Sequence, residues 1–390
     1  MTGSSITNFV PLSNIHENSS SCTCPQHVEI TDFTKLDHHA FKLRYRSNSV
    51  ISASTTEDEK PLPVIKILGT GGTIASKAQS SNVTAGYAVD LTIEELLSHI
   101  PDLSTTCILE YEQVMNIDSK DMGLEEVSIL HGQIKKDLDK YDGIVITHGT
   151  DTMEETAFFI QSTINTEKPI VFCGSMRPST AISSDGPMNL YQAIVIASHR
   201  ESRGRGVLIA LNDRIGAGYY ITKSNANSLD TFKTVGQGYI GNFVNDEVRY
   251  YFPSAKPLGM TYFEVDKEFH LPEVPIVYAH QGLNEKLLEL SIKELDAKGL
   301  VIATMGAGSL SAKTNEFLTK LVEPGFPVIY SKRSMDGMVP LGGLPKFNGK
   351  VFENAVAGGY LNPQKARILL QLCLNEGYDL KKIKKVFKTV

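Results

Sequence analysis

The chain of 390 residues lacks tryptophan entirely, has few cysteines and contains no block of basic residues. The cysteines are odd in number and scattered, which favours a reducing compartment over a disulfide framework; they are Cys22, Cys24, Cys107, Cys173 and Cys373. A net charge of -6 disfavours nucleic acid and anionic membranes as partners. No secretory leader pattern and no apolar run of bilayer length are present, so we expect a cytoplasmic protein with no membrane partner.

Residues 1–61 differ in composition from the rest, because they are rich in Ser, Thr and Asn and end in an acidic run beside two prolines. This composition predicts a flexible N-terminal tail. Cys22 and Cys24 are too small a cluster to form a zinc site alone, although His27, His38 and His39 follow them. We therefore predict a solvated tail and no metal site.

Short apolar runs alternate with helical patterns from residue 62 onward, which predicts an α/β fold with a mostly parallel sheet. The predicted strands are 64–68, 143–147, 169–174, 206–212, 275–280, 299–305 and 327–331. A helix is predicted over 284–298, with Gly299 at its C-cap. We expect a large N-terminal domain (62–255), a linker (256–274) and a smaller α/β C-terminal domain (275–390).

The first stretch with chemical character is 67–76 (ILGTGGTIAS), where a buried strand ends at glycines and threonines. A dinucleotide loop would need glycine in place of Ile74, and a P-loop would need Gly-Lys-Ser/Thr, so two phosphate-binding interpretations are excluded. Loops at the carboxyl ends of parallel strands hold ligands, and the Thr73 hydroxyl is suited to face a small substrate there. An ordinary turn with capping threonines is the alternative.

The second stretch is 145–155 (VITHGTDTMEE), which predicts strand, turn and helix start in quick succession. Asp151 with Glu154, and Thr152 with Glu155, have the spacing of a capping box. Thr150 and Asp151 would then stand at a helix N-terminus, where backbone N–H groups stabilise an anion. Simple helix capping explains the same residues, and His148 is better explained as a hydrogen-bonded turn residue than as a base.

Together the two stretches resemble the paired signatures of the bacterial-type L-asparaginase/glutaminase family. The resemblance extends from residue 63 to the C-terminus through 116–122 (NIDSKDM), 175–179 (SMRPS), 184–190 (SDGPMNL), 222–223 (TK) and 361–367 (LNPQKAR). It implies hydrolysis of L-asparagine to L-aspartate and ammonia, without metal or organic cofactor. It also implies a homotetramer, as in type II-like enzymes, with active sites at subunit contacts.

Residue roles follow from the matched motifs. The resemblance identifies Thr73 as the nucleophile that forms an acyl-enzyme, and Thr150, Lys223 and Asp151 as the second catalytic group. Ser119 and Asp151 would hold the carboxylate and amine of the substrate, and Asp118, Ser175 and Ser309 are further substrate-binding positions. A lysine base needs a lowered pKa; otherwise Lys223 stays cationic and orients Thr150. The sequence leaves both alternatives open, and leaves open which threonine attacks first.

Three positions depart from the family pattern. Val83 occupies the place of a loop tyrosine that assists the nucleophile, and Tyr87 is a substitute candidate whose alternative role is packing. Lys120 stands where relatives carry Gln or Glu near the substrate amine, and its cation would repel an ammonium unless its stem turns away. Residues 338–345 (MVPLGGLP) contain no acid where relatives supply a glutamate to the neighbouring subunit. We expect these changes to affect specificity more than reaction class.

Asparagine is the favoured substrate. Glutamine, which is longer by one methylene, is a possible secondary substrate, because a pocket discriminates one methylene by only about 1–3 kcal/mol. Two further hypotheses keep the fold but change the function. One is a related amidohydrolase, such as a glutaminase-asparaginase or an ammonia-supplying amidotransferase subunit. The other is a non-catalytic amino-acid-binding regulator, which would have no use for two activated hydroxyl groups.

Overall fold

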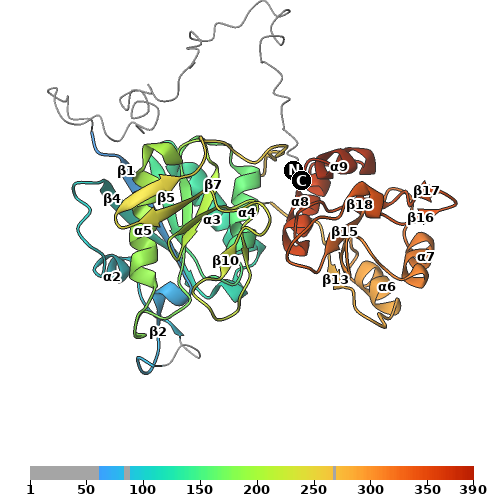
Figure 1. The fold of residues 1–390 in the computed structure, drawn as a ribbon, viewed down its shortest axis with the longest axis horizontal. Helices are drawn as coiled ribbons and strands as arrows, with labels where there is room; N and C mark the ends of the chain where they lie inside the picture. Colours follow the sequence, from blue (N-terminus) through green and yellow to red (C-terminus); the bar gives the residue numbers. More distant parts are fainter. Residues whose placement is uncertain (1–60, 83–87, 267–268) are drawn as a thin grey trace, which may run out of the picture. The chain divides into compact units, whose positions relative to one another are not determined.

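The structure is a computed structural model that describes residues 61–82, 88–266 and 269–390. The predicted tail up to residue 60, Val83 and the candidate Tyr87 lie outside these ranges. Figure 1 shows the fold, with strands as arrows and helices as coils.

The large domain is built on an eight-stranded sheet with the order β12-β11-β8-β7-β6-β5-β1-β4. Strands β4, β1, β5, β6 and β7 are parallel to one another, and β8, β11 and β12 continue the sheet with antiparallel pairings. The bounds are β1 (Val64–Gly71), β4 (Ile108–Ile117), β5 (Gly143–Thr147), β6 (Ile170–Cys173), β7 (Val207–Leu211), β8 (Arg214–Ala217), β11 (Gly241–Val244) and β12 (Glu247–Tyr250). The predicted mostly parallel sheet is therefore confirmed.

Both faces of this sheet are covered, which explains the near-continuous hydrophobicity of its inner strands. Neighbouring residues Val145 and Ile146 of β5 are both fully buried but belong to two different hydrophobic clusters, because successive side chains of a strand point to opposite faces. One cluster includes α5 (Gly186–Ser198), and the other includes α3 (Leu124–Asp137) and α4 (Met153–Thr163).

The smaller domain has a four-stranded, wholly parallel sheet with the order β13-β14-β15-β18. Its strands are β13 (Ile276–Tyr278), β14 (Leu300–Thr304), β15 (Val328–Lys332) and β18 (Ala355–Ala357). Its helices are α6 (Lys286–Lys293), α7 (Ala312–Leu321), α8 (Pro363–Asn375) and α9 (Leu380–Phe387). The predicted smaller α/β domain at the C-terminus is present.

Short elements complete the structure. They are α2 (Ile93–Leu97), the pair β2 (Ser76–Lys77) and β3 (Ala88–Val89), the pair β9 (Thr222–Lys223) and β10 (Phe232–Lys233), and the pair β16 (Lys346–Phe347) and β17 (Lys350–Val351). Four 3-10 turns are described, at Thr73–Ala75, Ser119–Asp121, Arg200–Ser202 and Leu341–Gly343. Two of these turns begin at residues that the sequence singled out, Thr73 and Ser119.

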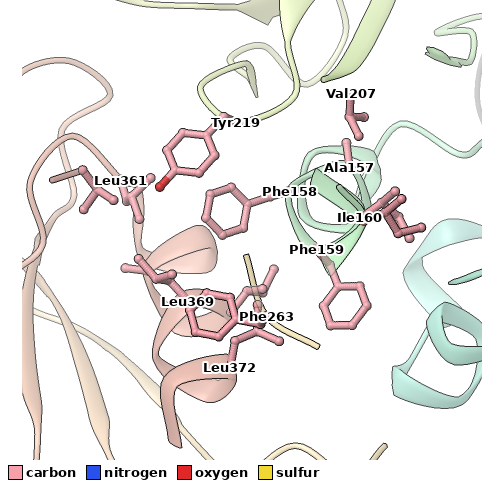
Figure 2. Close-up of a cluster of buried hydrophobic side chains, with 14 of the residues drawn as sticks. Ala157, Phe158, Phe159, Ile160, Val207, Tyr219, Phe263, Leu361, Leu369 and Leu372 are labelled. Carbon is pink, nitrogen blue, oxygen red and sulfur yellow. The ribbon is translucent and has the colours of Figure 1, made fainter. Parts of the chain in front are cut away.

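The segment between β12 and β13 is held by aromatic side chains. Phe263 is 2 % exposed and lies in the cluster that Figure 2 shows, between Phe158 and Phe159 of α4 and Leu369 and Leu372 of α8. The Phe263 N–H also donates to Ser162 O at 2.9 Å. The described part of this segment is therefore anchored to the hydrophobic core.

The helix predicted over 284–298 is shorter in the structure, because α6 ends at Lys293 with Glu294 as its C-cap. Leu295, beyond the end of α6, is 51 % exposed, and Gly299 is not the cap. A Cβ at Gly299 would lie 2.7 Å from Leu370 Cδ2, so close packing of α8 is the reason for glycine there.

Candidate active site

Glycines at the carboxyl ends of β1 and β5 bring three sequence motifs together. The Gly72 N–H donates to Ile117 O at 2.9 Å, which ties the first threonine loop to the end of β4. A Cβ added at Gly72 would lie only 2.3 Å from Gly149 Cα, and one at Gly149 would lie 2.5 Å from Ser119 Oγ. Backbone contact this close requires glycine, and Gly72 also has a φ of +82°.

Thr73 opens the 3-10 turn that follows Gly72 and is half-buried. The turn is fixed from both sides: Thr70 Oγ1 donates to Thr147 O at 2.8 Å, and Ser76 Oγ donates to Gly72 O at 2.9 Å. Ile74, where a dinucleotide loop would need glycine, is 1 % exposed and fills the core beside Gly186. The Thr73 hydroxyl is therefore carried on a turn whose backbone has little freedom to move.

Thr150, Asp151 and Lys223 form one hydrogen-bonded group. Lys223 Nζ donates to Thr150 Oγ1 at 2.9 Å and to Asp151 Oδ1 at 2.6 Å. Thr150 is 5 % exposed, whereas 59 % of the Asp151 side chain is exposed. Since the lysine donates to the threonine oxygen, the hydroxyl proton of Thr150 remains available for another acceptor.

Ser119 is 2 % exposed and joins the same group through the backbone. Its hydroxyl accepts from the Asp151 N–H at 3.2 Å, and its carbonyl accepts from Thr152 Oγ1 at 2.8 Å. Thr73, Ser119, Thr150, Asp151 and Lys223 are thus brought together from four separate stretches of chain. Few of these contacts involve residues close in sequence, so only the folded sheet can create the group.

Asp118 caps the turn that carries Ser119 and is paired with Lys120. Lys120 Nζ lies 2.5 Å from Asp118 Oδ2 and 3.7 Å from Asp121 Oδ2. The hydrogen bond with Asp118 raises the pKa of Lys120. The cation expected to repel a substrate ammonium is therefore directed at two carboxylates, as the flexible stem allows.

The two predicted capping boxes at the start of α4 do not form, so that prediction is wrong. Thr152 occupies the N-cap position, but its side chain accepts no hydrogen bond from the backbone of the first turn, because its hydroxyl donates to Ser119 O instead. Glu154 is 3 % exposed and accepts from the Lys223 N–H at 2.5 Å and from Asn362 Nδ2 at 2.9 Å. The acid expected to cap its own helix instead binds two distant segments.

Sequence reasoning gives Glu154 only a role in capping its own helix and gives Asn362 none, although both lie in matched motifs. The one local signal is the second acid at the helix start, which capping explains sufficiently. Asn362 is the N-cap of α8, and its partner Glu154 is 208 residues away. A contact at that separation leaves no pattern in a single sequence.

His148 belongs to the second threonine loop and is fully buried. Its Nδ1 lies 2.7 Å from Gly149 O, and its Nε2 lies 3.0 Å from Thr156 Oγ1. Burial lowers the pKa of His148 to about 4, although the contact with the Gly149 carbonyl acts in the opposite direction. The expected hydrogen-bonded turn residue is what the structure contains.

Ser175 and Ser309 are separate from the hydrogen bonds described above. Ser175 is fully buried, and its hydroxyl donates to Arg177 O at 2.7 Å. Ser309 is exposed in the smaller domain, in the loop after β14, where its carbonyl accepts from the Met305 N–H. Their substrate contacts stay predictions, as does the catalytic role of Tyr87. Within the described ranges, no three His, Cys, Asp or Glu residues could together hold a metal ion.

The glycine-framed threonine turns and the lysine-linked hydroxyl at the edge of a parallel sheet fit the class of enzymes that hydrolyse amides through a hydroxyl nucleophile, and comparison with known families agrees. Residues 64–256 match the family described as "Asparaginase, N-terminal", and 273–387 match "Glutaminase/Asparaginase C-terminal domain". The chain belongs to the asparaginase family.

Individual relatives are similar over most of their length. L-asparaginase 2-3 of Saccharomyces cerevisiae is 49% identical, over 86% of this chain and 92% of that protein. L-asparaginase 2 of Escherichia coli is 40% identical, over 84% of this chain and 93% of that protein. The crystal structure of a probable cytoplasmic L-asparaginase from Campylobacter jejuni matches with a TM-score of 0.78 and 37% identity, over 85% of this chain and 100% of that chain.

Proposed function

We propose that this protein is an L-asparaginase that hydrolyses the side-chain amide of L-asparagine to L-aspartate and ammonia. The observation that carries the proposal is the contact of Lys223 Nζ with Thr150 Oγ1 and Asp151 Oδ1, next to a Thr73 turn packed on Gly149. Membership of the asparaginase family and the names of its relatives support the same activity.

In the proposed reaction the Thr73 oxygen attacks the amide carbon of the substrate. The C–N bond breaks, ammonia leaves with the proton lost by Thr73, and an ester joins the threonine to the aspartyl group. Water then cleaves the ester and returns the proton to Thr73. Two steps with an activated hydroxyl replace one difficult attack by water on an amide.

Thr150 and Lys223 have the geometry to pass that proton in the proposed scheme. Because Lys223 Nζ donates to Thr150 Oγ1, the threonine can donate its own proton toward the leaving group. Asp151 keeps part of its surface exposed, and its carboxylate is suited to an ammonium group of the substrate. Ser119, with neighbouring backbone N–H groups, is suited to the substrate carboxylate.

Several finer points belong to the same proposal. We propose the domain limits 62–255 and 275–390 around the segment 256–274, a homotetrameric assembly and a cytoplasmic location. The domain limits are supported by the absence of a strand between Tyr250 and Ile276 in the described residues. The cytoplasmic location is supported by three buried free thiols at Cys107, Cys173 and Cys373. No described helix has both the length and the apolar character needed to cross a membrane.

The test is ammonia release from L-asparagine and from L-glutamine by the purified full chain. We expect saturable release from asparagine and slower release from glutamine. Thr73→Ala should abolish turnover with unchanged circular dichroism, while Thr73→Ser, which keeps a hydroxyl, should retain measurable activity. Wild-type rates in Thr73→Ala would refute the assignment of the nucleophile, and no release by the wild type would refute the activity itself.

A further inference from the structure

The segment that carries Lys223 is held by the first turn of α8, which belongs to the smaller domain. Asn362 is the N-cap of α8, and its Oδ1 accepts from the Lys365 N–H at 3.0 Å. Its Nδ2 donates to Glu154 Oε1 at 2.9 Å and contacts Thr222 Oγ1 at 3.3 Å. One amide side chain thus caps its own helix and reaches the large domain at the residue before Lys223.

Glu154 completes the connection. Its other oxygen, Oε2, accepts from the Lys223 backbone N–H at 2.5 Å. A carboxylate that is 3 % exposed needs donors for both oxygens, and these two bonds supply them. The path from the smaller domain to Lys223 is therefore two hydrogen bonds long, from Asn362 to Glu154 and from Glu154 to the lysine backbone.

Lys365 holds the chain just before Lys223. Its Nζ donates to Gly218 O and Tyr219 O, each at 3.0 Å, and to Ile221 O at 2.5 Å. All three ammonium protons are thus used on backbone carbonyls of the turn that leads into β9. Figure 2 shows Tyr219 beside Phe158, and their ring centroids lie 4.8 Å apart. The turn is fixed by hydrogen bonds and by aromatic packing.

Burial lowers the pKa of Lys365 to about 8, while the charges of Glu154 and Glu155 act in the opposite direction. Lys332, on β15, is the cation that also lowers it. A lysine this costly to bury is poorly explained by packing alone, since an apolar residue would fill the same space. Its three carbonyl contacts give it a specific use, which is to fix the backbone before Lys223.

We propose that Asn362 and Glu154 are positioning residues for Lys223, so that the smaller domain sets the catalytic geometry of the large domain within one chain. Neither residue touches the Thr150 hydroxyl in the described structure; both act through the Lys223 backbone. A displacement of this backbone moves Nζ relative to Thr150 Oγ1 and Asp151 Oδ1. The inference rests on the proposed amidase function, in which Lys223 orients Thr150.

The test exchanges donor and acceptor between the two positions. Asn362→Asp keeps the oxygen that caps α8 but replaces the donor to Glu154 by a second carboxylate. Glu154→Gln keeps one acceptor and turns the other into a donor that faces Asn362 Nδ2 or the Lys223 N–H. Each single substitution should lower kcat by about tenfold, with KM changed less than threefold, because a displacement well under 1 Å suffices.

The double variant, Glu154→Gln with Asn362→Asp, restores complementarity: the new amide donates to the new carboxylate and still accepts from the Lys223 N–H. We expect kcat to recover to within about threefold of wild type. Asn354→Asp is the matched control, because Asn354 is a buried amide of the same domain that donates to Glu323 O and Phe326 O. It should lower the melting temperature and leave kcat unchanged.

The proposal is overturned if both single variants keep wild-type kcat, or if the double variant stays as slow as the singles while melting like wild type. These outcomes are measured against a wild-type chain that releases ammonia from L-asparagine. Absence of release by the wild type would instead refute the proposed function, so the two failures are distinguishable.

Discussion

Gly72→Ala is the substitution for which the structure predicts the largest effect from the smallest change. The added methyl group would stand 2.3 Å from Gly149 Cα and 2.4 Å from Gly149 N, both backbone atoms that cannot rotate away. Ordinary van der Waals contact begins at 3.4 Å, so the two threonine loops would have to separate by about 1 Å. A displacement of that size at a reacting group costs about 100-fold in rate.

A second cost comes from the backbone, since Gly72 has a φ of +82°. Its ψ is -174°, and this combination of angles is essentially restricted to glycine, so an L-residue there is destabilised by roughly 1–3 kcal/mol. Gly325→Ala is a control for a positive φ without a clash, because Gly325 has a φ of +92° and a methyl group added there would have no atom beyond its chain neighbours within 4 Å. Both variants should therefore lose stability, and only Gly72→Ala should also lose activity.

The assay is ammonia release from L-asparagine at saturating substrate, beside thermal unfolding of both variants and the wild type. We expect kcat of Gly72→Ala to fall by about 100-fold and kcat of Gly325→Ala to stay within about twofold of wild type. A Gly72→Ala protein with wild-type kcat would show that the loops can separate without loss of function, which contradicts the geometric argument.

Two further predictions concern charge. Asp118→Asn should raise KM for L-asparagine by roughly two- to fivefold, because Lys120 keeps only its longer pairing with Asp121 and its cation can then repel the substrate ammonium. Adding Lys120→Gln should reverse the change. A double variant that keeps the raised KM would mean that Asp118 itself binds substrate. His131 is 1 % exposed, and burial lowers its pKa to about 4. As pH falls from 6.5 to 4, this histidine is therefore protonated in the unfolded chain before it is protonated in the folded one, and stability is lost across that window. As pH falls from 7 to 5, the free energy of unfolding of His131→Leu should therefore rise relative to that of the wild type by about 1–2 kcal/mol, measured by urea titration. If the unfolding free energies of the two proteins change in parallel with pH, the argument is contradicted.

Much of the fold could be predicted because buried parallel strands have a strong and local signal. β5 coincides with the predicted range, and β6, β7, β14 and β15 agree to within one or two residues. Strand β4 is absent from the predicted strands because it is an edge strand with Glu110 and Glu112 in its middle. Glu110 accepts a hydrogen bond from Tyr141, and Glu112 pairs with Lys66. These partners stabilise two acidic side chains within the strand, and the local sequence pattern gives no sign of them.

The candidate site was predictable as a set of motifs but not as a network. Thr73, Thr150 and Asp151 stand at the ends of recognisable strands, where ligands are expected. Glu154 was expected to cap its own helix. Its actual partners are Lys223, from a distant part of the same domain, and Asn362, whose contact depends on how the two domains pack. Local rules of capping cannot anticipate a competitor that arrives from 208 residues away.

The aromatic packing around Phe263 limits how this chain could be recombined with its relatives. Phe158, Phe263 and Leu369 come from three separate stretches of sequence, yet they share one cluster of buried side chains. A chimaera that joins the large domain of this protein to the smaller domain of another would pair unmatched surfaces across that cluster. Exchange of domains should succeed only when the connecting segment and the facing residues of α4 and α8 are inherited together.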